Sequence, residues 1–79
     1  MLGGMDERMI QIHLVDLGCV AEAIGLERRL ARTLGVLGAM VNPATDTAYI
    51  RYDGFRTSPE RLRAAIMAAG FGTHEPAVS

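Results

Sequence analysis

The stretch from residue 35 to residue 53, GVLGAMVNPATDTAYIRYD, contains the clearest strand pattern in the chain. Its first part, VLGAMVN, is compatible with a strand, and NPATD supplies the Asn, Pro and Asp residues that favour a tight reversal. The segment TAYIRYD then alternates between two faces. Its buried face is expected to consist of Ala48, Ile50 and Tyr52. The stretch therefore predicts a β-hairpin.

A second alternating segment and a helical segment precede the hairpin. Residues 9–15, MIQIHLV, predict a half-buried strand whose apolar face consists of Ile10, Ile12 and Leu14. Residues 20–34 predict an amphipathic helix that ends at Gly35. The apolar stripe of this helix consists of Val20, Ala23, Ile24, Leu26, Leu30 and Leu34. Gly25 lies within the helix, and we expect a strand to approach it closely.

A second helix and a short strand follow the hairpin. Ser58 before Pro59 is a strong signal for the start of a helix, and Gly70 is expected to end it. Its apolar stripe consists of Leu62, Ala65, Ile66 and Ala69. The resulting order, βαββαβ, predicts an α+β fold of the ferredoxin-like type: a four-stranded antiparallel sheet with two helices on one face. This architecture serves many functions, so the fold alone does not assign one to this chain.

Composition restricts the classes of function. A chain of 79 residues is long enough for one domain, which we place at residues 9–74 with flexible termini at 1–8 and 75–79. The net charge is −1, and the arginines lie mainly on the two predicted helices beside acidic residues such as Glu27 and Glu60. With few aromatic residues as well, the composition argues against nucleic-acid binding. No segment is apolar enough to insert into a membrane. A single cysteine excludes an internal disulfide and favours a cytoplasmic location.

Cys19 is the only cysteine in the sequence, and it lies where the first predicted helix begins. Backbone N–H groups at a helix start favour negatively charged ligands, and Glu22, three residues later, lies on the same side of the first turn. The pair is therefore compatible with a metal site. Spacing alone favours the other interpretation, a small buried cysteine and a glutamate that only caps the helix.

The hairpin stretch and the later segment LRAAIMAAGFG resemble the heavy-metal-associated domain family of metallochaperones and metal-pumping P-type ATPases. The resemblance covers about residues 9–74 and includes a family pattern similar to G-V-x-x-x-x-V-N-x-A-T-x-x-A-x-V-x-Y-D. This pattern is matched here by Gly35, Val36, Val41, Asn42, Ala44, Thr45, Ala48, Ile50, Tyr52 and Asp53. The resemblance implies a metal-binding domain with the fold predicted above.

The resemblance places Cys19 at the first metal-binding cysteine of the family motif Gly-Met-Thr-Cys-x-x-Cys, and Glu22 replaces the second cysteine. Asp16, Leu17 and Gly18 replace the three residues before it. A plant branch of zinc-pumping ATPases has a similar Cys-Cys-x-x-Glu motif, in which Gly18 would replace the first cysteine. The altered motif implies that metal specificity has changed or that metal binding has been lost.

One thiolate and one carboxylate suit a divalent transition metal better than Cu(I), which prefers two sulfur ligands. We expect Zn(II), with Cd(II), Co(II) and Ni(II) as further candidates. Two ligands leave a tetrahedral ion incomplete, so Asp16, water, a partner protein or a second copy in a metal-bridged dimer has to contribute. His13 is expected on the open sheet face and His74 in the tail, both outside the site. Phe71 is expected to shield the metal loop.

The sequence leaves three classes of function. The first is a cytoplasmic metal-binding domain, either free as a metallochaperone or at the amino terminus of a metal-transporting ATPase, with transporter domains or a chaperone as partners. The second is a degenerate domain that has lost metal binding and acts in protein interaction or autoregulation. An enzyme is the third and least supported class, because no histidine or other base accompanies Cys19.

Overall fold

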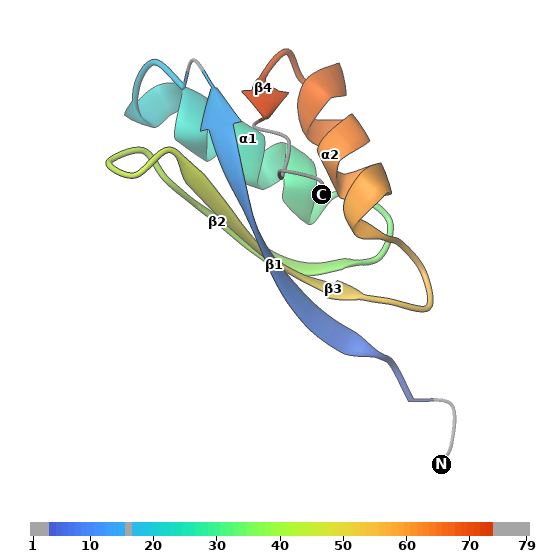
Figure 1. The fold of residues 1–79 in the computed structure, drawn as a ribbon. Coiled ribbons are helices and arrows are strands. Elements are labelled where there is room, and N and C mark those ends of the chain that lie inside the picture. Colours follow the sequence, from blue (N-terminus) through green and yellow to red (C-terminus); the bar gives the residue numbers. More distant parts are fainter. Residues whose placement is uncertain (1–3, 16, 74–79) are drawn as a thin grey trace, which may run out of the picture.

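The computed structural model describes residues 4–15 and 17–73, and it contains the predicted βαββαβ order (Figure 1). The elements are β1 (Glu7–Val15), α1 (Val20–Ala31), β2 (Val36–Asn42), β3 (Thr47–Asp53), α2 (Pro59–Ala68) and β4 (Gly72–Thr73). The hairpin strands β2 and β3 begin and end where the sequence pattern predicts. β1 begins at Glu7, two residues before the alternation in the sequence becomes clear.

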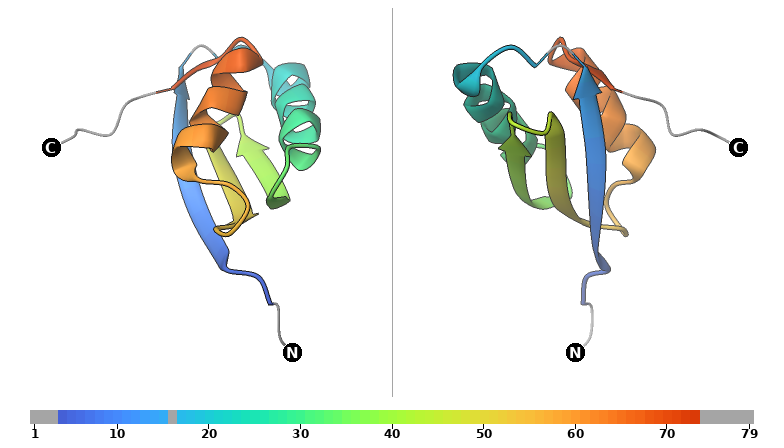
Figure 2. Two further views of the ribbon diagram at one scale, coloured as in Figure 1. Left: turned by 90° about the vertical axis from the view of Figure 1, so that its right-hand side faces the viewer. Right: turned by 60° about the vertical axis from the view of Figure 1, so that its left-hand side comes forward.

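The four strands form one antiparallel sheet in the order β2-β3-β1-β4. β1 pairs with β3 over its first seven residues and with β4 only at Leu14 and Val15. Both helices lie on the same face of the sheet, and the opposite face is open (Figure 2). The predicted ferredoxin-like fold is therefore confirmed.

The core lies between the helices and the covered face of the sheet. It consists of Ile12, Leu14, Ala23, Leu26, Leu30, Val41, Ala48, Ile50, Tyr52, Leu62 and Ile66. The alternation predicted for β1 and β3 is confirmed, since their apolar residues at every second position lie in this core or pack against it. Apolar area removed from water contributes roughly 25 cal/mol per Å², so these few side chains provide most of the driving force for folding.

α1 differs from its prediction in two respects. It ends at Ala31 rather than near Leu34, and Gly35, with φ of +87°, belongs to the turn that leads into β2. The buried stripe is also narrower than predicted, because only Ala23, Leu26 and Leu30 face the sheet. Val20, Ile24 and Leu34 are 60%, 45% and 68% exposed.

The surroundings of Gly25 also differ from the prediction, because no strand approaches it. A Cβ atom built on Gly25 would meet no atom within 4 Å. The neighbouring residue, Leu26, faces the sheet instead and is 1% exposed. The predicted role of Gly25 in a close approach is therefore wrong.

α2 begins and ends as the sequence predicts. The Ser58 hydroxyl accepts a hydrogen bond from the Arg61 N–H (3.3 Å), and Pro59 occupies the first helical position. At the other end Gly70, with φ of +98°, donates to the Met67 carbonyl (3.0 Å). The following N–H, of Phe71, donates to the Ile66 carbonyl (3.2 Å), which completes a Schellman motif. This ending turns Phe71 back onto the core.

Three connections meet at one end of the molecule. The loop between β1 and α1, the turn between β2 and β3, and the turn between α2 and β4 all lie at the end of the sheet where β1 finishes (Figure 1). The Leu14 N–H donates to the Asp46 carbonyl (2.7 Å), which ties the hairpin turn to β1. None of the described helices is long and apolar enough to cross a membrane.

Candidate metal centre

Cys19 occupies the N-cap position of α1 in an extended conformation, with φ of −160° and ψ of 173°. Its carbonyl accepts the N–H groups of Glu22 (3.1 Å) and Ala23 (3.2 Å), whereas its side chain makes no capping hydrogen bond. The cysteine is free and exposed. The exposure contradicts the alternative in which Cys19 is a small buried side chain, and the sulfur is accessible to a metal ion.

Glu22 lies in the first turn of α1, and its carboxylate folds back over the loop. Oε1 accepts the Gly18 N–H at 2.6 Å, and a Cβ atom on residue 18 would lie 2.9 Å from that same oxygen. Glycine at position 18 therefore makes room for the carboxylate. No hydrogen bond from the described residues reaches Oε2, so one oxygen of Glu22 is available as a ligand.

Phe71 lies beside this turn, as expected. A shallow hollow of about 230 Å³ is lined by Glu22, Gly25, Leu26, Arg29, Ala69 and Phe71. Phe71 is half-buried and packs against the core. Whether the ring shields a bound metal stays a prediction.

The other candidate ligands do not join this pair among the residues described. Asp16, the predicted third ligand, and His74 lie outside the described part of the chain. His13 is exposed on the open face of the sheet, as predicted. Within residues 4–15 and 17–73, no three side chains of His, Cys, Asp or Glu are grouped closely enough to hold an ion. Cys19 and Glu22 therefore form an incomplete ligand set.

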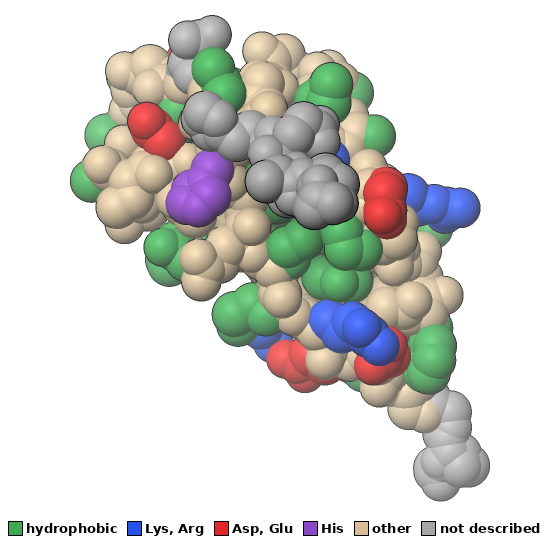
Figure 3. All heavy atoms as spheres, viewed as in Figure 1, with side chains coloured by type: hydrophobic (Ala, Val, Ile, Leu, Met, Phe, Trp, Pro, Cys, Tyr) green, Lys and Arg blue, Asp and Glu red, His purple; other side chains and the backbone are tan. Residues whose placement is uncertain are grey.

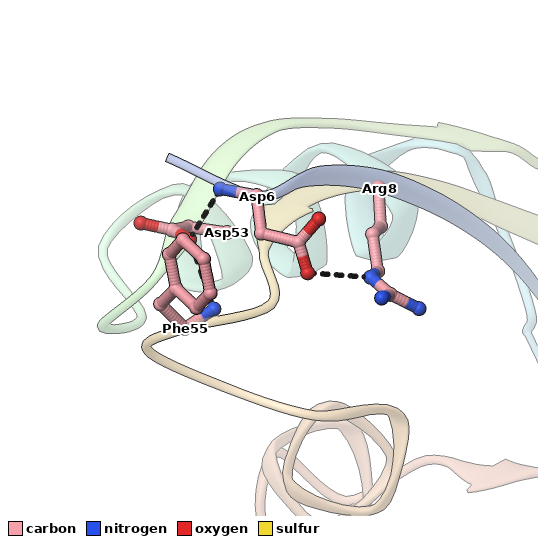
Figure 4. Close-up of polar contacts among 4 residues, drawn as sticks. All are labelled: Asp6, Arg8, Asp53 and Phe55. Carbon is pink, nitrogen blue, oxygen red and sulfur yellow. Dashed lines mark hydrogen bonds and ion pairs between the residues drawn. The ribbon is translucent and has the colours of Figure 1, made fainter. Parts of the chain in front are cut away.

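A second polar cluster, which sequence reasoning did not single out, lies at the opposite end of the sheet (Figure 4). Asp53 is 6% exposed, and its Oδ1 accepts the N–H groups of Asp6 (3.1 Å) and Phe55 (2.9 Å). These two N–H groups, with a smaller contribution from the Arg56 guanidinium, lower the pKa of the Asp53 carboxyl against the opposing effect of burial. The cluster joins the start of β1 to the loop after β3, which is a structural role.

Comparison with known families assigns the chain. The model of the heavy-metal-associated domain matches residues 11–72. The chain therefore belongs to the heavy-metal-associated domain family, whose members bind transition metals. No curated protein sequence matches this one at a significant level.

Solved structures agree with this assignment. A structure determined in work on crosstalk between Cu(I) and Zn(II) homeostasis is 31% identical, with a TM-score of 0.78, over 85% of this chain and 96% of that one. A copper-binding domain from HMA7, a P-type ATPase, is 27% identical, with a TM-score of 0.82, over 85% and 90%. The N-terminal soluble domains of Bacillus subtilis CopA are 30% identical, with a TM-score of 0.82, over 91% of this chain and 48% of that one.

Proposed function

We propose that this domain binds a divalent transition metal, Zn(II) first among them, through the Cys19 sulfur and the Glu22 carboxylate. The observation that supports the proposal is an exposed sulfur and a carboxylate with one oxygen available on the same helix turn. Asp16 is the third candidate ligand within the chain. Cd(II), Co(II) and Ni(II) accept the same types of ligand.

The ligand chemistry favours a divalent ion over Cu(I). Cu(I) selects soft sulfur ligands, and a chain with one cysteine offers only one thiolate. Zinc accepts thiolate and carboxylate in one tetrahedral site. Several of the similar structures are described as copper proteins, and the change from a second cysteine to Glu22 is the reason for proposing a different ion here.

An exposed, incomplete ligand set suits a protein that hands its metal on. A partner protein can supply the missing ligands. The ion then passes from one protein to the other by ligand exchange, without release into solvent. We therefore propose that residues 9–74 act in the cytoplasm, as the amino-terminal delivery or regulatory domain of a metal-transporting P-type ATPase or as a free metallochaperone. Partners are a transporter domain, a chaperone, or a second copy that shares the metal.

The hydrogen bond between Glu22 and Gly18 favours a second candidate function. A carboxylate that accepts a backbone N–H at 2.6 Å stabilises the loop and the helix start without any metal. On this alternative the domain has kept the scaffold, lost metal binding and acts in protein interaction or autoregulation.

Two-dimensional ¹H–¹⁵N NMR during titration with Zn(II), Ni(II), Co(II) and, without oxygen, Cu(I) separates the two candidates. We expect Zn(II) to shift the amide signals of Gly18 to Glu22 and of Gly70 and Phe71, with 1:1 saturation. A chain that shows no shift with any ion would support the degenerate alternative. Tight binding of Cu(I) alone would contradict the divalent assignment.

Matched variants test the two ligands. Cys19→Ser should abolish Zn(II) binding, and Glu22→Gln should weaken it while Oε1 can still accept the Gly18 N–H. Glu60→Gln is the control, because Glu60 is exposed in the first turn of α2, the other helix of the domain. If Glu60→Gln weakens binding as much as Glu22→Gln does, the carboxylate of Glu22 is not a ligand.

A further inference from the structure

We propose a second site for divalent metal ions on the open face of the sheet, formed by the His13 imidazole and the Asp46 carboxylate. It would take ions that accept imidazole nitrogen, such as Ni(II), Co(II) and Zn(II). The site shares no residue with Cys19 and Glu22, so it stands or fails independently of the function proposed above.

Hydrogen bonding around Thr47 determines which nitrogen of His13 faces solvent. His13 and Thr47 are register partners in β1 and β3, and the Thr47 side chain is buried beside the exposed ring. The Thr47 hydroxyl donates its only hydrogen to the Thr45 carbonyl at 2.9 Å. In its 3.3 Å contact with His13 Nδ1, the hydroxyl oxygen can therefore only accept.

It follows that Nδ1 carries the hydrogen and that Nε2 of the neutral ring has the free lone pair. Histidines that bind metals almost always donate their other ring N–H to a carboxylate, carbonyl or water, which fixes the tautomer and the ring orientation. The Thr47 hydroxyl has this role here. His13 is thus oriented as a ligand, which an exposed histidine with no partner would not be.

Asp46 lines the same hollow as His13, and its backbone is fixed there. Its φ of +52° is a left-handed conformation that aspartate tolerates, and its carbonyl accepts the Leu14 N–H at 2.7 Å. A hollow of about 410 Å³ is lined by His13, Leu14, Thr45 and Asp46. Histidine and acidic side chains are both visible on this face of the molecule (Figure 3).

The two types of ligand atom at this second site determine which ions it prefers. Imidazole nitrogen with carboxylate oxygen suits Ni(II), Co(II) and Zn(II), whereas Mg(II) prefers oxygen ligands alone. Within residues 4–15 and 17–73, no third histidine, cysteine or acidic side chain joins this pair. Water is the ligand available for the remaining coordination positions. Binding at such a site is weak and exchanges quickly.

The tautomer is tested without metal. Long-range ¹H–¹⁵N correlation of the unmodified chain at a pH of about 8, above the ordinary range for histidine, should show the hydrogen of His13 on Nδ1. Thr47→Val removes the acceptor and keeps the side-chain shape, so the Nδ1–H preference should be lost. A ring in the unmodified chain that carries its hydrogen on Nε2 would overturn the proposal.

Metal binding is tested in a chain with both Cys19→Ser and Glu22→Gln, where the first site is removed. Paramagnetic Ni(II) should broaden the signals of His13 and of residues 45–47, and Mg(II) should leave them unchanged. Adding His13→Gln should abolish the effect. Adding Asp46→Asn should weaken the apparent Ni(II) affinity by about tenfold or more, the scale seen even for partners of metal ligands.

Two outcomes contradict the second site. One is an absence of broadening at His13 in the double variant, and the other is an Asp46→Asn chain that binds Ni(II) unchanged. Failure of the Cys19 site would appear separately, as a chain with intact Cys19 and Glu22 that shows no Zn(II) shifts at Gly18 to Glu22.

Discussion

Glu22 stands where the two-cysteine motif that the sequence resembles has its second cysteine. Gly18 is its structural complement, because the carboxylate occupies the space that a Cβ atom would need. On the function proposed above the two residues act together: Glu22 would offer oxygen in place of sulfur, and Gly18 allows the carboxylate to fold back onto the loop.

Glu22→Cys is the direct test of this residue. It provides two thiolates at i and i+3, and we expect Cu(I) to bind the variant at least tenfold more tightly than it binds the unmodified chain, because Cu(I) selects sulfur ligands. Competition with a chromophoric Cu(I) chelator under anaerobic conditions measures the change. Glu22→Ser is the control, and equal Cu(I) affinities for the Cys and Ser variants would show that position 22 does not face the ion.

The lowered pKa of Asp53 predicts that the free energy of unfolding depends on pH. Its pKa is lowered in the folded chain by the N–H groups of Asp6 and Phe55, and in the unfolded chain it returns to its ordinary value of about 3.9. The unfolded state therefore binds more protons as the pH falls. This contribution to the free energy of unfolding is complete above about pH 4 and is lost as the pH falls through the folded pKa.

Asp53→Asn should remove that dependence. We expect the variant to be less stable at pH 7, where it lacks the charge-assisted hydrogen bonds, and to lose less stability on acidification. Urea unfolding from pH 7 to pH 2 measures both effects, with Asp46→Asn as an exposed control. Parallel curves for the Asp53→Asn chain and the unmodified chain would refute the role given to this carboxylate.

At the scale of elements, α1 and β2 are joined by a hydrogen bond across the edge of the sheet. The Glu27 Oε2 atom accepts the Val41 N–H at 2.7 Å, on the side of β2 that faces no other strand of the described sheet. The carboxylate thus satisfies a partly buried donor and protects the edge.

Glu27→Ala should lower the free energy of unfolding by about 1–3 kcal/mol, because it leaves the Val41 N–H without an acceptor. Amide hydrogen exchange at Val41 should accelerate more than at Ile50 in the central strand. Glu27→Gln keeps an acceptor oxygen and should lose less. A Gln variant as unstable as the Ala variant would indicate that charge, rather than this hydrogen bond, is the cause.

Two glycines in the helical segments should respond in opposite directions to alanine. Gly70 has φ of +98°, so Gly70→Ala should cost roughly 1–2 kcal/mol and loosen the position of Phe71. Gly25 lies inside α1 with open space around it, so Gly25→Ala should stabilise by roughly 0.5–1 kcal/mol. Chemical denaturation of both variants provides the comparison, and a destabilised Gly25→Ala chain would contradict the open space.

The sequence predicted the elements whose signals are local. Ser58, Pro59 and Gly70 delimit α2, and the alternation of residues 47–53 delimits β3, because caps and strand faces depend on adjacent residues. The end of α1 was not predicted, since Leu34 fits a helical stripe in sequence. In the structure α1 ends at Ala31, and the turn that contains Gly35 leads from the helix into β2, which pairs with β3.

For the whole molecule, the small core makes stability sensitive to single substitutions. A chain of 79 residues has a net stability of about 4–12 kcal/mol at the usual value per residue. Leu62 is fully buried, so Leu62→Ala should cost about 2–5 kcal/mol. Leu34 is 68% exposed, and Leu34→Ala should change stability by less than about 0.5 kcal/mol.

Thermal unfolding followed by circular dichroism compares the two variants, and similar melting temperatures would contradict the assignment of the core. Because the Cys19 loop is exposed, a Leu62→Ala chain that remains folded should keep the Zn(II) affinity of the unmodified domain. Measuring Zn(II) affinity alongside the melting temperature therefore distinguishes a defect in core packing from a defect in metal binding.

The candidate site was predictable in part. Their positions at the start of the helix made Cys19 and Glu22 candidate ligands, and the family resemblance suggested what they bind. The hydrogen bond from Gly18 to Glu22 could not be predicted, because it depends on how the loop bends before α1. The same holds for the pairing of His13 with Thr47, residues that only the sheet register brings together.

The antiparallel pairing also determines the order of events during synthesis. Within this domain, β1 and the Cys19 loop are translated before β3 and β4, the strands of the described sheet that pair with β1, with Glu7 opposite Asp53. The loop that would hold the metal is therefore translated long before the sheet that supports it can close. A nascent chain halted before residue 47 lacks both strands that pair with β1. On the function proposed above, a preformed metal site would therefore be available only after residues 47–73 are translated.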